Sequence, residues 1–201
     1  MREAALGLRV HSGWATLVAI GEPRKAPVCL LRRRIELVEG TTEDARQPYH
    51  AAQGLELPKA ARLIEKAREA AEERGFKELR AAVDELKAKG AKVQACGVVV
   101  GGNSPLRELQ KILASHPMVH AAEGVLYREV VIAAGRRLHV GVVAVPEKEL
   151  AHEAAQSLGL DAAAIEERVL AYRKLMGAPW RKDEQQATLA AWIALVGRER
   201  T

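Results

Sequence analysis

Two short strands that meet at a turn are predicted by the stretch Leu6-Gly7-Leu8-Arg9-Val10-His11-Ser12-Gly13-Trp14-Ala15-Thr16-Leu17-Val18-Ala19-Ile20. Apolar residues dominate both halves of the stretch, and a Ser-Gly pair between them is typical of a tight turn. One basic residue, Arg9, stands inside the first of the two strands. The stretch therefore predicts an antiparallel pair of buried strands that carries a charged side chain.

Three further strands extend this pair into a sheet. Residues 28–38 are expected to follow as a third antiparallel strand. Residues 92–100 end in an unbroken run of valines, which is typical of a central strand covered on both faces. The last strand is expected at 140–145. Because helices separate the later strands, their crossovers favour parallel pairing, and we expect residues 4–10 to lie next to 92–100.

Helical periodicity fills the rest of the chain. It begins at Lys59 and restarts out of phase after Gly75, which predicts two helices that end at Gly90. A further helix follows the turn at Gly101, and the others are expected at 117–138, 147–158, 162–176 and 182–198. The order predicts an α/β fold with a mixed five-stranded sheet, an antiparallel three-strand meander plus two parallel strands. Helices flank the sheet, and we expect residues 1–201 to form one domain.

Composition narrows the classes of protein. No apolar run approaches the length of a membrane span, and charged residues interrupt any candidate secretory signal at the N-terminus. We therefore expect a cytoplasmic protein in which Cys29 and Cys96 are reduced, buried thiols. The net charge is +5, but basic residues alternate with Glu along helices and aromatic residues make up only 3%. This pattern indicates weak, non-specific binding of nucleic acid at most.

Short motifs place the chain near a known family. Gly7-Leu8-Arg9 followed by Ser12-Gly13-Trp14-Ala15 resembles the start of the ribonuclease-H-like superfamily, and RuvC-type Holliday-junction resolvases in particular. The closing helix, which is acidic at Asp183 and then rich in Ala and Leu, is similar to the last helix of these enzymes. The resemblance implies the ribonuclease-H-like fold, with extra C-terminal helices. It also implies carboxylates on the first strand, fourth strand and last helix that hold two divalent cations about 4 Å apart.

The residues at these three places depart from the family pattern. Arg9 stands at the first-strand position, and residues 92–100 contain no acidic side chain, whereas Asp183 remains on the last helix. Because hard divalent cations need several oxygen anions, we expect neither a metal nor a cofactor at this position. We expect Arg9 to satisfy a carboxylate or to bind an anion. Asp183 is its first candidate partner, and Glu36 and Glu123 are the alternatives.

Two further groups are candidates for a rebuilt site. His120 and Glu123 fall at helical spacing and should project side by side, as a metal-ligating or base–orienter pair or as an ordinary polar contact. Zinc sites normally have three or four protein ligands, so the pair alone predicts no metal centre. Tyr49 and His50 either line a pocket, or pack their loop onto the core and cap the next turn.

The turn Gly101-Gly102-Asn103-Ser104 is the best candidate for contact with a small anion. It follows a central strand and precedes a helix start, where free backbone N–H groups favour negative charge. The glycine spacing fits no phosphate-binding fingerprint. A structural role, in which Asn103 or Ser104 caps the helix, therefore fits the turn better.

We expect a bacterial ribonuclease-H-like domain that has lost its nuclease site and serves in binding or assembly. A second copy of the chain or another protein would be its partner. Two alternatives stay open. One is a divergent enzyme with a rebuilt site around His120, Glu123 and the Gly101–Ser104 turn. The other is a nucleic-acid binder that recognises structure weakly and does not cleave.

Overall fold

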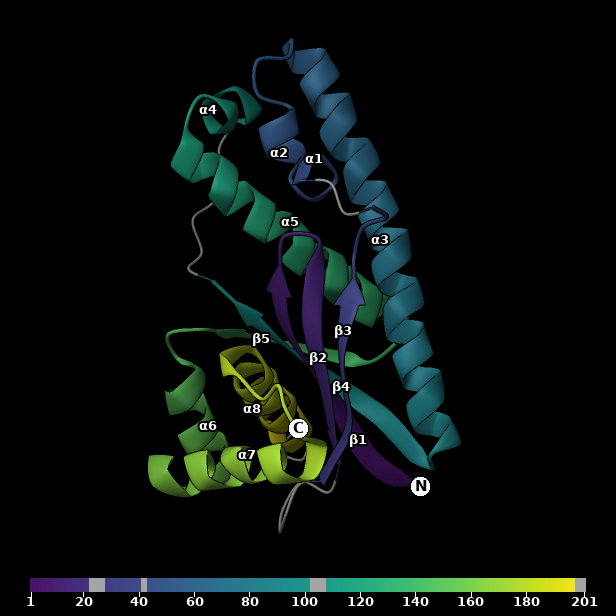
Figure 1. Ribbon diagram of the computed structural model, residues 1–201, viewed down its shortest axis with the longest axis vertical. Coiled ribbons are helices and arrows are strands. Elements are labelled where there is room, and N and C mark those ends of the chain that lie inside the picture. The colour runs from purple at the N-terminus through teal and green to yellow at the C-terminus, as the bar shows by residue number, and fades with distance from the viewer. Residues whose placement is uncertain (22–27, 41–42, 102–107, 198–201) are drawn as a thin grey trace.

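The centre of the fold is a five-stranded sheet of order β3-β2-β1-β4-β5 (Figure 1). The computed structural model describes residues 1–21, 28–40, 43–101 and 108–197. The strands are β1 (Arg2–His11), β2 (Trp14–Gly21), β3 (Val28–Glu36), β4 (Ala91–Val100) and β5 (Gly141–Pro146). The first three strands form an antiparallel meander, while β4 lies parallel to β1 and β5 lies parallel to β4. The expected mixed sheet and the contact of its first strand with residues 92–100 are confirmed.

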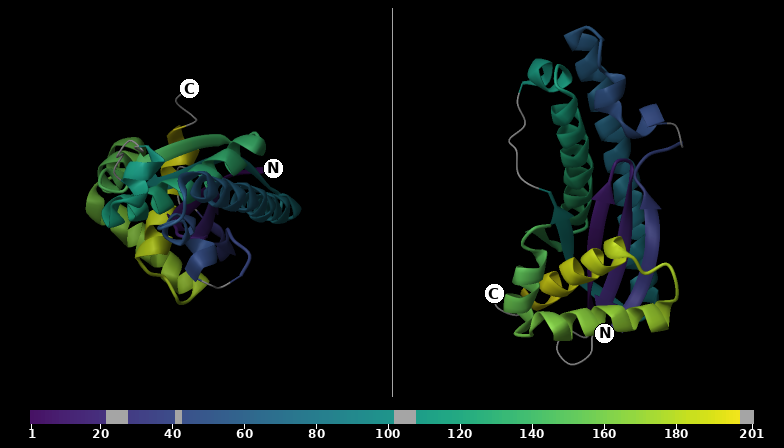
Figure 2. Two further views of the ribbon diagram at one scale, coloured as in Figure 1. Left: turned by 90° about the horizontal axis from the view of Figure 1, so that it is seen from above. Right: turned by 60° about the vertical axis from the view of Figure 1, so that its left-hand side comes forward.

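Helices cover both faces of the sheet. The long helices α3 (Leu57–Ala88) and α5 (His116–Arg137) lie on one face, and α8 (Lys182–Gly197) lies on the other (Figures 1 and 2). Helices α6 (Leu150–Leu158) and α7 (Ala162–Met176) pack beside α8. The short helices α1 (Glu43–Arg46), α2 (Pro48–Ala51) and α4 (Leu109–Leu113) lie at the opposite end of the molecule from α7. None of the described helices combines the length and the apolar character that a membrane span needs.

The alternation of side chains along β1 decides where Arg9 lies. Leu6, Leu8 and Val10 are buried in the larger core, which α3 and α5 complete. Successive side chains of a strand point to opposite faces, so Gly7 and Arg9 face α8 instead. The start of α8 and the end of β1 are thereby brought together.

Helix α8 lies unusually close to the sheet because two strands carry glycine beneath it. A Cβ atom added to Gly7 would lie 1.8 Å from the backbone oxygen of Ala187, and one added to Gly97 would lie 2.0 Å from that of Ala190. Ala187 and Ala190 are themselves fully buried. The small residues of this helix, which is rich in Ala, therefore form a packing surface that fixes the position of α8.

A single helix, α3, spans the range in which two helices were predicted, so the expected break at Gly75 is wrong. The buried positions continue at four-residue spacing from Ala71 through Gly75 to Leu79. A Cβ atom on Gly75 would lie 2.9 Å from Cγ1 of Val130 on α5, so the glycine lets the two helices pack closely. The apparent phase jump arises because a residue without a side chain does not register as part of an apolar stripe.

Smaller differences concern element boundaries. The polar segment 39–54, which shows no periodicity in the sequence, contains α1 and α2, and α6 begins at Leu150 rather than near 147. The beginning of the helix expected after Gly101 falls outside the described residues. Asp161 accepts a hydrogen bond of 2.7 Å from the backbone N–H of Ala164 and thereby caps the start of α7.

Candidate functional site

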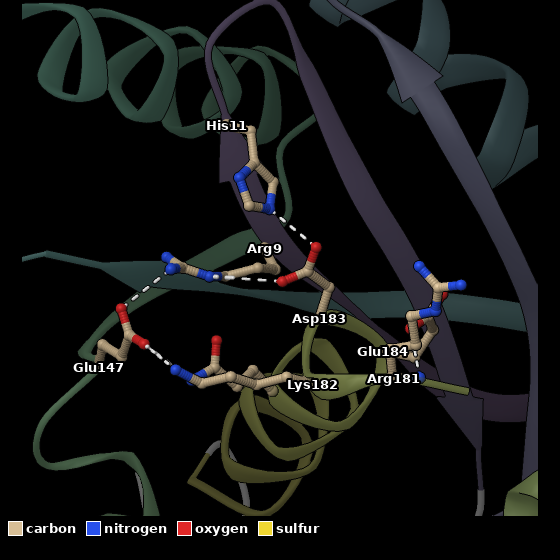
Figure 3. A network of polar contacts seen from close by, with 8 residues as sticks. Arg9, His11, Glu147, Arg181, Lys182, Asp183 and Glu184 are labelled. Carbon is tan, nitrogen blue, oxygen red and sulfur yellow. Dashed lines mark hydrogen bonds and ion pairs between the residues drawn. The ribbon is translucent and has the colours of Figure 1, made fainter. Parts of the chain in front are cut away.

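Polar side chains gather where the carboxyl ends of β1, β4 and β5 meet the start of α8 (Figure 3). Arg9 and His11 come from β1, and Asp183 comes from the first turn of α8. Glu147 follows directly after β5, and its backbone N–H donates to the carbonyl oxygen of Val100 at 2.8 Å. Ligands of open α/β sheets bind at this kind of edge.

Arg9 lies between two carboxylates. Its Nη2 atom donates to Oε2 of Glu147 at 2.9 Å, and its Nε atom lies 4.0 Å from Oδ1 of Asp183. The Arg9 side chain is only 18% exposed, and each of the two carboxylate side chains is 29% exposed. Asp183 was the expected partner, whereas the closer partner, Glu147, escaped the sequence analysis. Glu36 and Glu123, the alternatives, make their contacts elsewhere.

The second oxygen of Glu147 is also occupied. Its Oε1 atom accepts hydrogen bonds from Nζ of Lys182 at 2.9 Å and from Nε2 of Gln186 at 3.1 Å. The hydrogen bonds from Gln186 and Lys182, together with the charge of Arg9, lower the pKa of Glu147 to about 2. The carboxylate is therefore ionised at neutral pH and fully engaged by the protein.

Asp183 has a second basic neighbour on β1. Its Oδ2 atom lies 2.9 Å from Nε2 of His11. The His11 ring is stacked on Trp14, with ring centroids 4.2 Å apart, and the guanidinium of Arg34 lies 3.9 Å from the Trp14 centroid. Stacking fixes the orientation of the imidazole, so His11 and Arg9 hold Asp183 from the same strand.

The residue beside Arg9 on the neighbouring strand is apolar. Arg9 pairs with Val99 in the parallel β1–β4 register, and paired residues of neighbouring strands share a face. Val99 is fully buried and packs in a cluster that includes Ala190 and Ile193 of α8. β4 therefore contributes a methyl-lined wall to the site and no oxygen ligand.

A second guanidinium adds positive charge near Arg9. A Cβ atom on Gly101 would lie 3.3 Å from Nη1 of Arg128, which projects from α5 towards the end of β4. Burial, followed by repulsion from Arg9, lowers the pKa of Arg128 below its ordinary value. Two arginines thus share this end of the sheet.

A cavity of about 740 Å³ opens beside the ion pairs. Its lining residues come from the ends of β4 and β5 and from α8: Gly101, Pro146, Glu147, Lys148, Glu149, Lys182 and Gln186. The other residues of the predicted anion-binding turn, Gly102, Asn103 and Ser104, lie outside the described residues. Of that turn, Gly101 alone is placed, at the rim of the cavity.

The candidate polar residues His120, Glu123 and Asp183 do not form one cluster, because they belong to two separate places. Asp183 lies beside Arg9, whereas Glu123 accepts hydrogen bonds from the backbone N–H groups of Tyr49 at 2.7 Å and His50 at 3.2 Å. Glu123 is 1% exposed, and burial raises its pKa to about 7. The carboxyl group points to the core beneath α2, while the side chain of His120 is on the surface.

The expected contact of His120 with Glu123 is accordingly wrong, and the Tyr49 ring packs inside the fold. Tyr49 is 5% exposed and belongs to the larger core, as its structural interpretation predicted. His120 instead lies with Nε2 at 3.0 Å from Nε2 of His116, one helical turn earlier. His50 joins these two rings.

The strand order and the helices on both faces define a ribonuclease-H-like fold. Two solved structures of RuvC from Thermus thermophilus share it over nearly the whole chain. One, a structure of RuvC, has a TM-score of 0.52, and the other, of RuvC in complex with a Holliday junction substrate, has 0.53. In both comparisons the sequence identity is 15%, and the match covers 98% of this chain and 96% of RuvC. No protein-family model and no curated protein sequence matches the chain.

Proposed function

We propose that this chain is a ribonuclease-H-like domain that serves in binding or assembly and does not hydrolyse phosphodiesters. The observation that carries the proposal is the position of Arg9, whose guanidinium lies 2.9 Å from Glu147 and 4.0 Å from Asp183. A two-metal nuclease uses its carboxylates to hold cations. Here a side chain of the protein supplies the positive charge.

Electrostatics oppose a divalent ion at this position. Two unit charges 4 Å apart interact by about 4 kcal/mol at an effective dielectric constant of 20, so Arg9 would repel a divalent ion by about twice that. Both oxygens of Glu147 already accept hydrogen bonds, and Val99, the neighbour of Arg9 on β4, offers no oxygen ligand. These contacts support the absence of the two-metal reaction.

A second candidate function is the binding of nucleic acid without cleavage. The favouring observation is the pair of arginines, Arg9 and Arg128, at the end of the sheet, with Lys148 and Lys182 on the adjoining cavity. Phosphate contacts of this kind give salt-sensitive binding without sequence preference. The RuvC of T. thermophilus in the comparison is in complex with a Holliday junction substrate. For this chain we expect weak binding only.

The rebuilt enzyme site has less support than either candidate. Glu123, its intended base or orienting group, is buried and accepts two backbone hydrogen bonds. These bonds hold α2 against α5. The Glu123 oxygen that accepts them is therefore not available to transfer a proton.

Cleavage and binding are tested in parallel on a labelled four-way DNA junction and a duplex of the same sequence. With Mg²⁺ or Mn²⁺ we expect no cleavage by the wild-type protein. Metal-dependent cleavage that disappears in Asp183→Ala would overturn the proposal.

Fluorescence anisotropy at low and physiological salt separates the two candidates. A preference for the junction over the duplex would favour the second candidate, whereas equal, salt-sensitive binding of both DNAs supports a protein partner. Sedimentation tests whether that partner is a second copy.

A further inference from the structure

Three histidines from two separate parts of the sequence meet on the surface of the molecule. His116 and His120 lie one turn apart at the start of α5, and His50 reaches them from α2, which packs against α5. The ring centroid of His50 is 5.5 Å from that of His116 and 4.6 Å from that of His120. One ring nitrogen of each histidine lies within 4.8 Å of those of the other two.

The spacing of these nitrogens fits a shared metal ion. Zinc binds imidazole nitrogen at 2.0–2.1 Å, so the ligand atoms of a tetrahedral site are roughly 3.4 Å apart. The two Nε2 atoms of His116 and His120 are 3.0 Å apart, and the largest separation in the set is below 4.8 Å. Small rotations of the imidazole rings would bring these nitrogens to the spacing of a tetrahedral site. Because His116 and His120 are exposed, an ion has direct access from solvent.

A buried carboxylate supports one of the three ligands. Oε1 of Glu123 lies 3.5 Å from Nδ1 of His50 and also accepts the backbone N–H of His50. Metal-bound histidines commonly present their second ring nitrogen to a carboxylate, which fixes the tautomer and makes the ligand more basic. Tyr127, one turn beyond Glu123, donates to the carbonyl oxygen of Arg46 at 2.8 Å and fastens the same segment. The ligand from α2 is therefore held in place before any ion arrives.

We propose that His50, His116 and His120 bind one Zn²⁺ ion, with water at the fourth position. Three imidazoles without a carboxylate ligand select zinc and similar transition metals over Mg²⁺ and Ca²⁺, which prefer oxygen. The ion would join α2 to the start of α5 and leave one coordination position open. The site is independent of the ion pairs around Arg9, so it stands whether or not the proposed function holds.

Zinc binding is measured on untagged, chelator-treated protein by competition with a chromogenic chelator. We expect one equivalent of Zn²⁺, and Co²⁺ as a probe should give the visible absorption of a tetrahedral nitrogen site. His116→Ala and His120→Ala should each weaken zinc binding by more than about 10-fold, the smallest effect usual even for groups that touch only a ligand. His50→Ala should do the same. His152→Ala is the matched control, because His152 is exposed on α6, away from the cluster.

Folding and metal binding are separated by the metal-free proteins. Circular dichroism and the Tm of His116→Ala and His120→Ala without metal should equal those of the wild type, because both side chains are exposed. Added Zn²⁺ should raise the Tm of the wild type and of His152→Ala, but not the Tm of His116→Ala or His120→Ala. Arg9→Ala should bind zinc like the wild type. Substoichiometric zinc in the wild type, or equal affinity in all variants, would overturn the proposal.

Discussion

The Nη2 atom of Arg9 lies 2.9 Å from Oε2 of Glu147, and this ion pair joins residues 138 positions apart in the chain. It ties the first strand to the residue that follows the last strand. The remaining oxygen of Glu147 accepts from Lys182 and Gln186 at the start of α8. One carboxylate thus connects three elements at the edge where ligands of open α/β sheets bind, and the charges there are compensated by the protein itself.

Replacing Arg9 by Ala should destabilise the fold by about 1–2 kcal/mol, between the effects usual for exposed and buried ion pairs. The loss has a simple cause: Glu147 and Asp183 would keep their negative charges without the cation that lies between them. Urea denaturation at pH 7 measures the change. Lys77→Ala, which removes an exposed ion pair with Glu73, is the control and should stay within about 0.5 kcal/mol of wild type. Equal effects of the two substitutions would contradict this role of Arg9.

The free energy of unfolding should decrease as the pH is lowered, and Glu147 should account for part of this decrease. Its pKa of about 2 in the folded protein lies below the ordinary value, so its contribution is complete above about pH 4.5 and is lost as the pH falls towards 2. The difference in unfolding free energy between wild type and Glu147→Gln should therefore shrink through this window. Chemical denaturation at several pH values tests it, and a constant difference from pH 6 to pH 2 would refute it.

The order of the sheet follows from local patterns, but the sites do not. Apolar runs and turns identify β1, β2 and β4, and the helices between later strands dictate parallel pairing. A periodicity says which face a residue occupies and nothing about its partner across the molecule. His116 and His120 are neighbours by helical spacing, whereas His50 joins them only because Glu123 caps α2 from beneath.

Glu147 could have been found from the sequence by one further step. It follows the last predicted strand directly, and the carboxyl ends of neighbouring parallel strands lie at one edge, beside the end of β1. The reverse error affected Gly75, where a residue without a side chain hid the continuity of α3. Both cases show that the missing information concerns packing between elements rather than the elements themselves.

Gly7→Ala should be among the most damaging single substitutions in the chain. The new Cβ atom would lie 1.8 Å from the backbone oxygen of Ala187, so α8 would have to move off the sheet. We expect a loss of about 3 kcal/mol or more. Gly197→Ala, at the end of the same helix, meets nothing within 4 Å and should change stability by less than about 1 kcal/mol. A tolerated Gly7→Ala would mean that α8 does not lie this close to β1.

Arg9→Asp should turn the ion-pair site into one that responds to divalent cations. The substitution places a third carboxylate beside Glu147 and Asp183, and their mutual repulsion should lower the Tm in a buffer without divalent cations. Mg²⁺ ions would relieve that repulsion. Binding at ten times the dissociation constant would stabilise the variant by about 1.4 kcal/mol, while the wild type, with Arg9 in place, should not respond.

Cleavage should still be absent in Arg9→Asp, because a two-metal reaction needs oxygen ligands for a second ion. The neighbour on β4 is Val99, which is buried against Ala190 and Ile193 and contributes none. Arg9→Asn is the matched control, since it removes the cation without adding a carboxylate and should respond to Mg²⁺ less than Arg9→Asp. Thermal unfolding with and without Mg²⁺, run beside the junction assay, gives both answers. A Mg²⁺-dependent Tm in the wild type, or cleavage by Arg9→Asp alone, would show that the fold retains more of a metal site than Arg9 and Val99 permit.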